Sequence, residues 1–463
     1  MAAPLFIGGT ASHVGKSWFT TAFCRLLANR GVRVAPFKAQ NMSNNSYPCI
    51  EGGEIGRSQA AQAEACRVPP MADMNPVLLK PTSVNGSQVV LRGKVWTHLE
   101  ARDYYTHTDS LLSLALESFR RLAATFDFVV CEGAGSVAEM NLLDRDIVNL
   151  RFAQAVGARA LLVADIERGG VFGSLAGTVE LLPAAQRALI RAFAVNRFRG
   201  DLRLFDDGVA FLEKRLGIPC LGVFPFDPTI RIDDEDSLSI NGAAAKGEIA
   251  AIRLPRISNF TDLRSIAPVA WIDSPVARQF RVVFLPGTKN TIEDLVWLRE
   301  QGLDSWIHAQ HDGGATIIGI CGGYQMLGES VADPDGLESS IASAPGLAML
   351  PVRTVLRAPK VTQVVQARTL AGAAFTAYEI HMGETRPLAN SAPFAFLADG
   401  TPEGLRAGRV MGTYLHGAFE DAAVVEEILG IEVTPPPKDE MYDRLAAWLK
   451  EHAKPEVLED LLA

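Results

Sequence analysis

The sequence predicts an α/β protein with two doubly wound domains, the first built on a mostly parallel sheet. In the first half, short β-branched runs alternate with amphipathic helical stretches, a pattern typical of parallel strands covered by helices. An acidic, weakly periodic stretch at residues 227–247 interrupts the alternation, which restarts at Glu248. The length of 463 residues exceeds one ordinary hydrophobic core, which also favours two or three domains.

We expect the first domain at residues 1–227, a linker at 228–247 and the second domain at 248–440. The candidate strands of the first domain are residues 5–9, 32–37, 128–131, 160–165, 193–196 and 220–224, and its clearest helices are 17–29, 56–66 and 110–124. The runs IAAIRLP, RVVFLPG and TIIGIC supply strands of the second domain. Prolines at 435–437 end it, and residues 441–463 are predicted to form a helical tail with a break at Pro455.

Composition excludes several classes of protein. The net charge is −9 and the sequence has no Lys/Arg cluster, which argues against nucleic-acid binding. No apolar stretch approaches the roughly 20 residues of a membrane span, and the start of the sequence lacks the features of a signal peptide. Six scattered cysteines without a CxxC pair fit neither a disulfide framework nor a zinc site. A reducing cytoplasm is therefore the expected setting.

Residues 4–23 predict a strand, a glycine-rich loop and a helix, which together form a phosphate-binding loop. Backbone amides of the loop and the helix N-terminus would hold the phosphates around Gly15. Lys16 would reach the terminal phosphates, and the Ser17 hydroxyl would bind Mg²⁺. The spacing departs from the common motif, because Thr10 stands where the first glycine is expected. His13 is a candidate lining residue of this loop.

Three carboxylates are candidates near this loop, because Mg²⁺ favours carboxylate ligands beside phosphate oxygens. Glu132 directly follows the strand at 128–131, so it is expected at the carboxyl edge of the sheet as a metal ligand. Glu54 and Asp146 are further candidates, and for each an ordinary surface carboxylate is an equally good interpretation.

Cys321 stands where an apolar strand turns into a helix, in the sequence GATIIGICGGYQMLG. A sharp turn of this kind exposes a nucleophile at its tip, and the amides of the following helix favour a thiolate. The alternative is a buried structural cysteine, the usual fate of a free thiol. The strand that ends in Cys-Gly-Gly favours the nucleophile.

A cysteine nucleophile needs a base and donors for the oxyanion. VMGTYLH predicts a strand that ends in His416, and His381 in YEIHMGET also lies near a strand end. We favour His416 as the base. The loop around Gly287 and the amide of Gly322 are the candidate oxyanion donors.

These motifs resemble known families. The half with Cys321 and His416 is similar to class I glutamine amidotransferase domains, and the N-terminal half is similar to the dethiobiotin-synthetase-like P-loop group. Joined in this order, they resemble the amidotransferases of the cobalamin pathway, and among these the cobyric acid synthase family. The motifs that carry the resemblance are GTASHVGKS, PFKAQNMSNNS, GGEIGRSQ, NPVLLKP, CEGAGS, DIERGGVF, NRFRGD, LPGTKNT, CGGYQMLG, YEIHMGET and YLHG, which span residues 9–417.

The resemblance implies ATP-dependent amidation of the b, d, e and g carboxylates of adenosylcobyrinic acid a,c-diamide, with glutamine as the source of ammonia. ATP and Mg²⁺ would be the cofactors, and glutamine and the corrinoid polycarboxylate the small-molecule partners. The polar stretch AQNMSNNS suits such a substrate, so Gln40, Asn41, Ser43, Asn44 and Asp146 are candidate substrate contacts. A polar surface loop is the alternative reading of that stretch.

The sequence departs from most class I amidotransferases at position 418, where Ala replaces the glutamate that orients the imidazole, as in the cobalamin-type enzymes. Glu420 and Asp421 remain open as substitutes. Two alternative functions remain as well. One is the a,c-diamide synthase of the same pathway, and the other is a MinD-like P-loop switch ATPase. The oligomeric state is not predicted.

Overall fold

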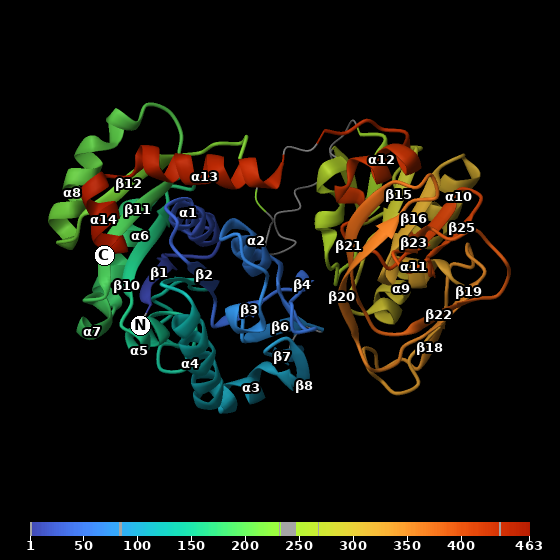
Figure 1. Cartoon of the computed structure of the whole chain (residues 1–463), viewed down its shortest axis with the longest axis horizontal. Helices are drawn as coiled ribbons and strands as arrows, with labels where there is room; N and C mark the ends of the chain where they lie inside the picture. The colour runs from blue at the N-terminus through green and yellow to red at the C-terminus, as the bar shows by residue number, and fades with distance from the viewer. Residues whose placement is uncertain (1, 83–85, 231, 233–246, 267, 435–436) are drawn as a thin grey trace.

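The computed structural model of the protein describes residues 2–82, 86–230, 232, 247–266, 268–434 and 437–463. Figure 1 shows two lobes side by side, the first formed by the N-terminal half of the chain and the second by most of the remainder. The predicted linker at 228–247 lies mostly outside the described residues. Among the helices described, none is long and apolar enough to cross a membrane.

A six-stranded parallel sheet forms the centre of the first lobe, in the order β12-β11-β10-β1-β9-β2. The predicted parallel sheet is thus confirmed, and all six predicted strands belong to it. Helices cover the sheet, so its strands are largely buried and nearly continuously apolar. The strands are β1 (Ala3–Gly9), β2 (Val34–Phe37), β9 (Phe128–Glu132), β10 (Arg159–Asp165), β11 (Ile190–Phe198) and β12 (Cys220–Pro225).

The helices of this lobe include the three predicted ones, which correspond to α1, α2 and α4. Helix α1 follows β1 directly and packs most of its residues into the core. The helices are α1 (Lys16–Asn29), α2 (Arg57–Ala65), α3 (Ala101–Tyr104), α4 (Thr108–Thr125), α5 (Leu150–Val156), α6 (Val171–Leu181), α7 (Ala184–Arg187) and α8 (Asp206–Leu216).

Two small sheets between β2 and α4 extend the first lobe toward the second (Figure 1). One has the order β3-β6-β7-β8, with β3 (Gln40–Met42) parallel to β6 (Val77–Pro81) and with β7 (Gly86–Leu91) and β8 (Lys94–Glu100) antiparallel. The other pairs β4 (Ser46–Pro48) with β5 (Glu54–Gly56). The polar stretch at 39–46 is therefore partly strand, which its composition did not predict.

The second lobe is built on a six-stranded sheet in the order β14-β13-β15-β16-β26-β25, in which only β25 is antiparallel. The three apolar runs seen in the sequence form β13, β15 and β16. The strands are β13 (Ile249–Ile252), β14 (Val269–Ile272), β15 (Val282–Leu285), β16 (Thr316–Ile320), β25 (Leu405–Ala407) and β26 (Val410–Thr413), and the helices are α9 (Thr291–Glu300), α10 (Leu303–Asp312), α11 (Gly322–Leu327) and α12 (Ala422–Leu429).

Two four-stranded sheets complete the second lobe. The long hairpin of β20 and β21 contacts β4 of the first lobe. The strands are β17 (Ser330–Ala332), β18 (Ser343–Pro345), β19 (Val352–Val355), β20 (Val361–Arg368), β21 (Ala374–His381), β22 (Glu384–Pro387), β23 (Ala395–Leu397) and β24 (Pro402–Glu403).

The predicted helical tail returns to the first lobe and completes its core (Figure 1). It consists of α13 (Lys438–His452) and α14 (Pro455–Leu462). The Trp448 ring lies 5.4 Å from Phe19 and 4.8 Å from Phe224 between ring centroids. The fully buried Arg25 of α1 donates to Asp443 of α13 at 2.7 Å. The first lobe is therefore assembled from both ends of the chain.

We predict that Trp448→Ala destabilises the first lobe by about 3 kcal/mol, because truncation of a buried aromatic side chain leaves a cavity. Denaturant unfolding monitored by fluorescence measures the effect. Trp96→Ala is the matched control, since Trp96 is 46% exposed and its loss should change the free energy of unfolding by less than about 1 kcal/mol. Equal effects of both substitutions would contradict the assigned core.

Candidate active site

The phosphate loop joins β1 to α1, and Lys16 lies across it. The Lys16 ammonium donates to the carbonyl oxygens of Ala11 at 2.9 Å and Gly135 at 2.8 Å. Gly15 has a φ of 109°, and a Cβ there would lie 2.1 Å from the Asn196 amide nitrogen. Only glycine fits this turn without strain or a clash. The loop therefore holds its lysine and its amides in a fixed arrangement at the end of β1.

Ser17 and Glu132, which the sequence predicts as metal ligands, lie together. The Ser17 hydroxyl donates to Glu132 Oε1 at 2.9 Å, and the Lys38 ammonium donates to the same oxygen at 3.0 Å. Gln62 donates to the other oxygen at 2.5 Å. Glu132 is 1% exposed, so these donors compensate for the loss of water around its carboxylate. Ser17 Oγ and Glu132 Oε1 are oxygen ligands of the kind that a hard divalent cation prefers, and their position beside the phosphate loop distinguishes them from Glu54. A cation bound there would replace the hydrogen bonds that Glu132 Oε1 now accepts.

Glu54 lies elsewhere, which corrects the expectation that it binds the metal. Its carboxylate is 1% exposed and accepts from Lys80 at 2.7 Å and from Lys360 of the second lobe at 2.5 Å. Burial opposes the charge, but Lys360 and Lys80 hold the pKa of Glu54 well below its usual range. Burial lowers the pKa of Lys80 to about 7, against the opposing effect of Glu54. Both oxygens of Glu54 are thus committed to an ion cluster.

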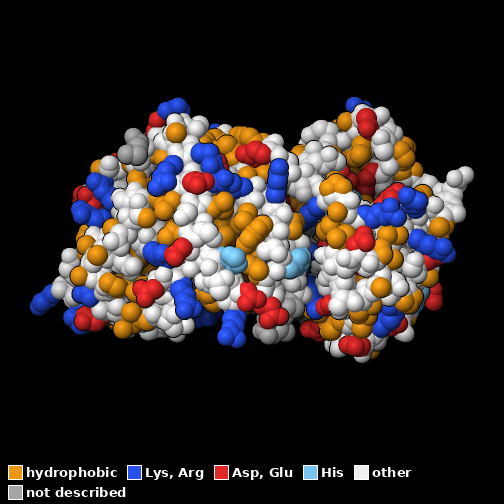
Figure 2. Space-filling model, turned by 90° about the horizontal axis from the view of Figure 1, so that it is seen from below, with side chains coloured by type: hydrophobic (Ala, Val, Ile, Leu, Met, Phe, Trp, Pro, Cys, Tyr) orange, Lys and Arg blue, Asp and Glu red, His pale blue; other side chains and the backbone are white. Residues whose placement is uncertain are grey.

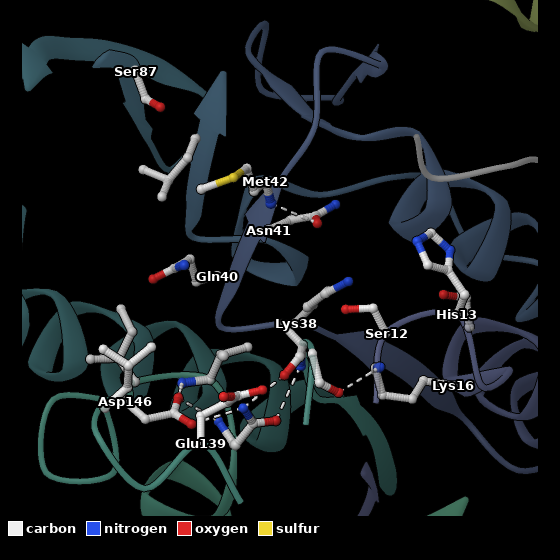
Figure 3. A pocket seen from close by; sticks show the side chains of 18 of the residues that line it. Ser12, His13, Lys16, Lys38, Gln40, Asn41, Met42, Ser87, Glu139 and Asp146 are labelled. Atoms are coloured by element: carbon white, nitrogen blue, oxygen red, sulfur yellow. Dashed lines mark hydrogen bonds between the residues drawn. The ribbon is translucent and has the colours of Figure 1, made fainter. Parts of the chain in front are cut away.

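A cavity of about 810 Å³ opens beside the phosphate loop. Figure 3 shows side chains from several separate segments surrounding it, Lys16, Lys38 and Asp146 among them. Of the predicted residues, its lining includes His13, Gly15, Lys16, Ser17, Gln40, Asn41 and Asp146. The cations Lys38, Arg145, Arg197 and Arg264, which received no role from the sequence, also line it.

The other residues predicted to bind nucleotide or substrate lie elsewhere or have additional contacts. The Thr10 amide donates to Val163 of the neighbouring strand at 3.0 Å, which fixes the start of the loop. Ser43 turns back on its own segment, where its hydroxyl accepts from the Asn45 amide at 3.0 Å. Asn44 lines a separate cavity at the boundary between the lobes. Asp146 lines the main cavity but also accepts from the Val148 amide at 2.7 Å, and burial raises its pKa.

Cys321 occupies a strained turn between β16 and α11. Its φ is 52° and its ψ −108°, which a residue with a side chain adopts at a cost of about 1–3 kcal/mol. The Cys321 amide donates to Thr413 of β26 at 2.8 Å, and the thiol lies 3.6 Å from the Ile380 carbonyl oxygen. The neighbouring strands therefore hold the sulfur at the tip of the turn, as expected for a nucleophile at a strand–helix junction.

His416 lies three residues beyond β26, which corrects the prediction that the strand itself reaches it. The backbone of His416 instead pairs with Tyr378 through two hydrogen bonds of 2.9 Å. The ring Nδ1 lies 2.8 Å from Asp262 Oδ2, and the other oxygen of Asp262 accepts from the Gly417 amide at 2.5 Å. Burial opposes protonation of the ring, but Asp262 and the Cys321 thiol raise the pKa of His416 to about 10.

Asp262 is therefore the carboxylate partner of the His416 imidazole. Glu420 and Asp421, the two candidates for this role from the sequence, have other contacts. Glu420 pairs with Arg57 at 3.4 Å and with Lys438 at 2.9 Å, and Asp421 caps the N-terminus of α12. Asp262 precedes His416 by 154 residues, so no local motif connects the two. No pattern in the sequence around Asp262 points to this role beyond the residue being an aspartate.

Gly287 and Gly322, the predicted oxyanion donors, frame the same site. A Cβ on Gly287 would lie 3.0 Å from His416 Cε1 and 3.0 Å from the Ser258 carbonyl oxygen. A Cβ on Gly322 would lie 2.7 Å from the Thr288 methyl group. A side chain at Gly322 would therefore force the neighbouring loop to shift, and one at Gly287 would be unusually tight, so both positions favour glycine. Their role as oxyanion donors remains a prediction.

A small cavity of about 30 Å³ adjoins the thiol. Its lining includes Cys321, Gly322, Gln325, His381, Lys80 and Lys360. His381 stacks on Tyr414 with 3.8 Å between ring centroids, and its Nε2 lies 3.8 Å from Glu379. The alternative base thus also borders the thiol, but His416 has the closer carboxylate.

The fold and these two sites define the class, a glutamine amidotransferase joined to a P-loop nucleotide-binding domain. Residues 248–424 match the CobB/CobQ-like glutamine amidotransferase domain, and residues 5–240 match the CobQ/CobB/MinD/ParA nucleotide binding domain. The chain belongs to the cobyric acid synthase family. It is 42% identical to the cobyric acid synthase of Parabacteroides distasonis over 98% of each chain. It is 46% identical to that of Pelodictyon phaeoclathratiforme, over 92% of this chain and 90% of the relative.

Membership in this family makes the protein a glutamine-hydrolysing amidotransferase that forms carbon–nitrogen bonds. The nucleotide-binding domain implies the use of ATP. The family assignment made from the sequence motifs is thus confirmed, and an enzyme is favoured over a P-loop switch protein.

We predict that Asp262→Asn lowers the pKa of His416, because a neutral amide does not stabilise the imidazolium. The alkaline limb of the glutaminase pH profile should then move to lower pH, and kcat should fall about 100-fold. Steady-state kinetics across pH measure both effects. Asp421→Asn is the matched control, since Asp421 only caps a nearby helix. A reduced kcat with an unmoved pH profile would show that Asp262 acts only on folding.

Proposed function

We propose that the protein amidates the b, d, e and g carboxylates of adenosylcobyrinic acid a,c-diamide, using ATP and ammonia from glutamine. The observation that carries this proposal is that one chain holds a thiol–imidazole–carboxylate site and a phosphate loop with its own large cavity. The cobyric acid synthases to which the chain is similar support the choice of substrate.

In the glutaminase reaction, the Cys321 thiolate attacks the side-chain amide carbon of glutamine, and the amides of Gly287 and Gly322 bind the oxyanion. His416 then donates its proton to the nitrogen as the carbon–nitrogen bond breaks. The products are ammonia and a glutamyl thioester. Water hydrolyses the thioester, and His416 recovers a proton from that water. The raised pKa of His416 supports its role as the proton donor in the first step.

In the ligase reaction, a corrinoid carboxylate attacks the γ-phosphate of ATP to give an acyl phosphate and ADP. Ammonia then attacks the acyl carbon, phosphate leaves, and a proton is released. Lys16 and the loop amides would stabilise the charge that develops on the phosphates. Ser17 and Glu132 would hold Mg²⁺, which neutralises charge on phosphate oxygens. The contact of 2.9 Å between these two side chains supports this assignment.

The large cavity suits a polycarboxylate. Its volume of about 810 Å³ lies within the range of pockets that bury sizeable ligands. Among the described residues, the lining of this cavity includes five cationic side chains, Lys16, Lys38, Arg145, Arg197 and Arg264, and two carboxylates, Glu139 and Asp146. Two of these cations have carboxylate partners outside the lining, Lys38 with Glu132 and Arg197 with Asp165, each at 3.0 Å. Local positive potential raises the concentration of an anionic substrate at the site. Gln40 and Asn41 add amide groups that match the amides and carboxylates of such a substrate.

Mass spectrometry tests the proposed substrate directly. We expect adenosylcobyrinic acid a,c-diamide incubated with the protein, ATP, Mg²⁺ and glutamine to give a series of up to four carboxylate-to-amide changes. If glutamine is hydrolysed but this acid is unchanged while cobyrinic acid gains two amides, the protein is instead an a,c-diamide synthase.

We predict that Cys321→Ala abolishes amidation with glutamine but retains amidation with added ammonium salts, because only the glutaminase step needs the thiol. The same mass-spectrometric assay with each nitrogen source measures the difference.

Lys16→Ala provides the contrast, since it should reduce amidation about 100-fold with either nitrogen source. Loss of both activities in folded Cys321→Ala would contradict the division of labour between the two sites.

A further inference from the structure

The imidazole of His416 is held by one hydrogen bond and one stacked ring. The side chain is fully buried, and its Nδ1 lies 2.8 Å from Asp262 Oδ2. Within the described residues, its Nε2 has no hydrogen-bond partner. A single hydrogen bond lets an imidazole pivot about that contact, because the terminal torsion of a histidine side chain has broad minima. The face of the ring therefore needs a second support.

Tyr378 supplies that support. Its ring stacks on the imidazole with 5.3 Å between centroids and 22° between planes. Tyr378 is buried, and its hydroxyl has no hydrogen-bond partner in the described part of the chain. A buried tyrosine usually anchors itself through its hydroxyl. Here the position of the ring instead depends on the groups that pack against it.

Two groups that pack against Tyr378 belong to the first lobe. The Tyr47 ring of β4 lies 4.8 Å from the Tyr378 ring between centroids, with 57° between the planes. The guanidinium of Arg57, the first residue of α2, lies 4.8 Å from the Tyr47 centroid and 5.8 Å from the Tyr378 centroid. Figure 1 shows β4 beside the β20–β21 hairpin at the boundary of the lobes. The stack on His416 thus continues across that boundary.

Contacts from both lobes hold Arg57 in this position. Its side chain is 2% exposed, and its guanidinium lies 3.4 Å from Glu420 Oε1 of the second lobe. Its backbone amide donates to the Asn45 carbonyl oxygen of the first lobe at 3.0 Å. A cation attracts an aromatic ring more strongly where water is excluded. A buried arginine that contacts two rings and a carboxylate therefore restrains both rings.

Small errors in the placement of a base have large effects on rate. A displacement of about 1 Å can lower a rate about 100-fold, even when the substitution lies far from the chemistry. Among the described residues that line the small cavity beside Cys321, neither Tyr47 nor Arg57 occurs. An effect of these two residues on glutamine hydrolysis would therefore act through Tyr378 and His416.

We propose that Tyr47 and Arg57 of the first lobe are positioning residues for glutamine hydrolysis, which hold the Tyr378 ring against His416 and so keep the imidazole directed at the Cys321 thiol. The glutaminase site is then complete only when the two lobes are docked. This inference goes beyond the proposed function, because it concerns glutamine hydrolysis alone and does not depend on the acid that receives the ammonia.

Steady-state kinetics of the full chain test this role. Glutamate formed from glutamine is measured with ATP and Mg²⁺ present, and kcat and KM are determined separately. We expect Arg57→Met to lower kcat about tenfold or more and to leave KM for glutamine within about twofold of wild type, since the base moves while the glutamine pocket does not. Tyr47→Leu should act in the same way, and Tyr47→Phe, which keeps the ring, should stay close to wild type.

Arg406→Met is the matched control. Arg406 also lies over an aromatic ring, 5.3 Å from the Phe394 centroid, and it pairs with Glu427 at 3.6 Å. All three residues belong to the second lobe, outside the stack on His416. The loss of this arginine should leave kcat close to wild type.

Alkylation by iodoacetamide, followed by mass spectrometry of the cysteine peptides, gives a second readout. A displaced imidazole should slow the alkylation of Cys321, because its thiolate loses a cationic partner. Partial unfolding would instead speed the alkylation of the other cysteines, all of which are buried. If Arg57→Met unfolds by this measure, the two Tyr47 variants decide the question.

An unchanged kcat in Arg57→Met and Tyr47→Leu would overturn the positioning role, and so would an equal loss of kcat in Arg406→Met. The same holds if Tyr47→Phe loses as much activity as Tyr47→Leu, because the ring contact would then not be what supports His416.

Discussion

The contact between Asp262 and His416 is the interaction on which the chemistry proposed for the second lobe depends. An imidazole that is fully buried loses its hydration, and without a carboxylate beside it the charged form would be disfavoured. Asp262 reverses that preference and binds the Gly417 amide with its other oxygen, so the ring and the turn that carries it are fixed together. Cys321 is held opposite by a strained turn. The fold thus prearranges the proposed glutaminase site.

The segment that carries Asp262 also docks the lobes. Asn259, three residues earlier, bonds to Asn45 and Ser46 of the first lobe, within the polar stretch that leads from β3 to β4. Figure 2 shows charged side chains of both signs distributed over the visible faces of both lobes. The specific contacts lie in the buried boundary, where the imidazole partner and the docking asparagine share one short segment.

Local sequence patterns were sufficient for the strands, the phosphate loop and the cysteine turn. The parallel strands are continuous apolar runs. The phosphate loop at Gly15-Lys16-Ser17 and the turn at Cys321-Gly322 are each formed by residues adjacent in sequence, so a short motif is enough to predict them. Asp262 and Lys360 could not be found in this way, because their partners His416 and Glu54 are distant in sequence and meet only through tertiary packing. Glu54 was misassigned for the same reason. The local sequence around a carboxylate in a glycine-rich stretch is the same whether that carboxylate binds a metal or two lysines.

The return of α13 and α14 to the first lobe has a consequence for biosynthesis. A ribosome completes every residue of the glutaminase lobe before it makes Trp448, Leu449 and Leu458, which the core of the ligase lobe requires. Domains tend to fold as they emerge from the ribosome, from the N-terminus onward. In this protein, the lobe whose synthesis begins first is the last whose core can be completed. A nascent or prematurely terminated chain therefore exposes an open ligase core, and a messenger truncated near its end yields a protein without a stable ATP-binding lobe.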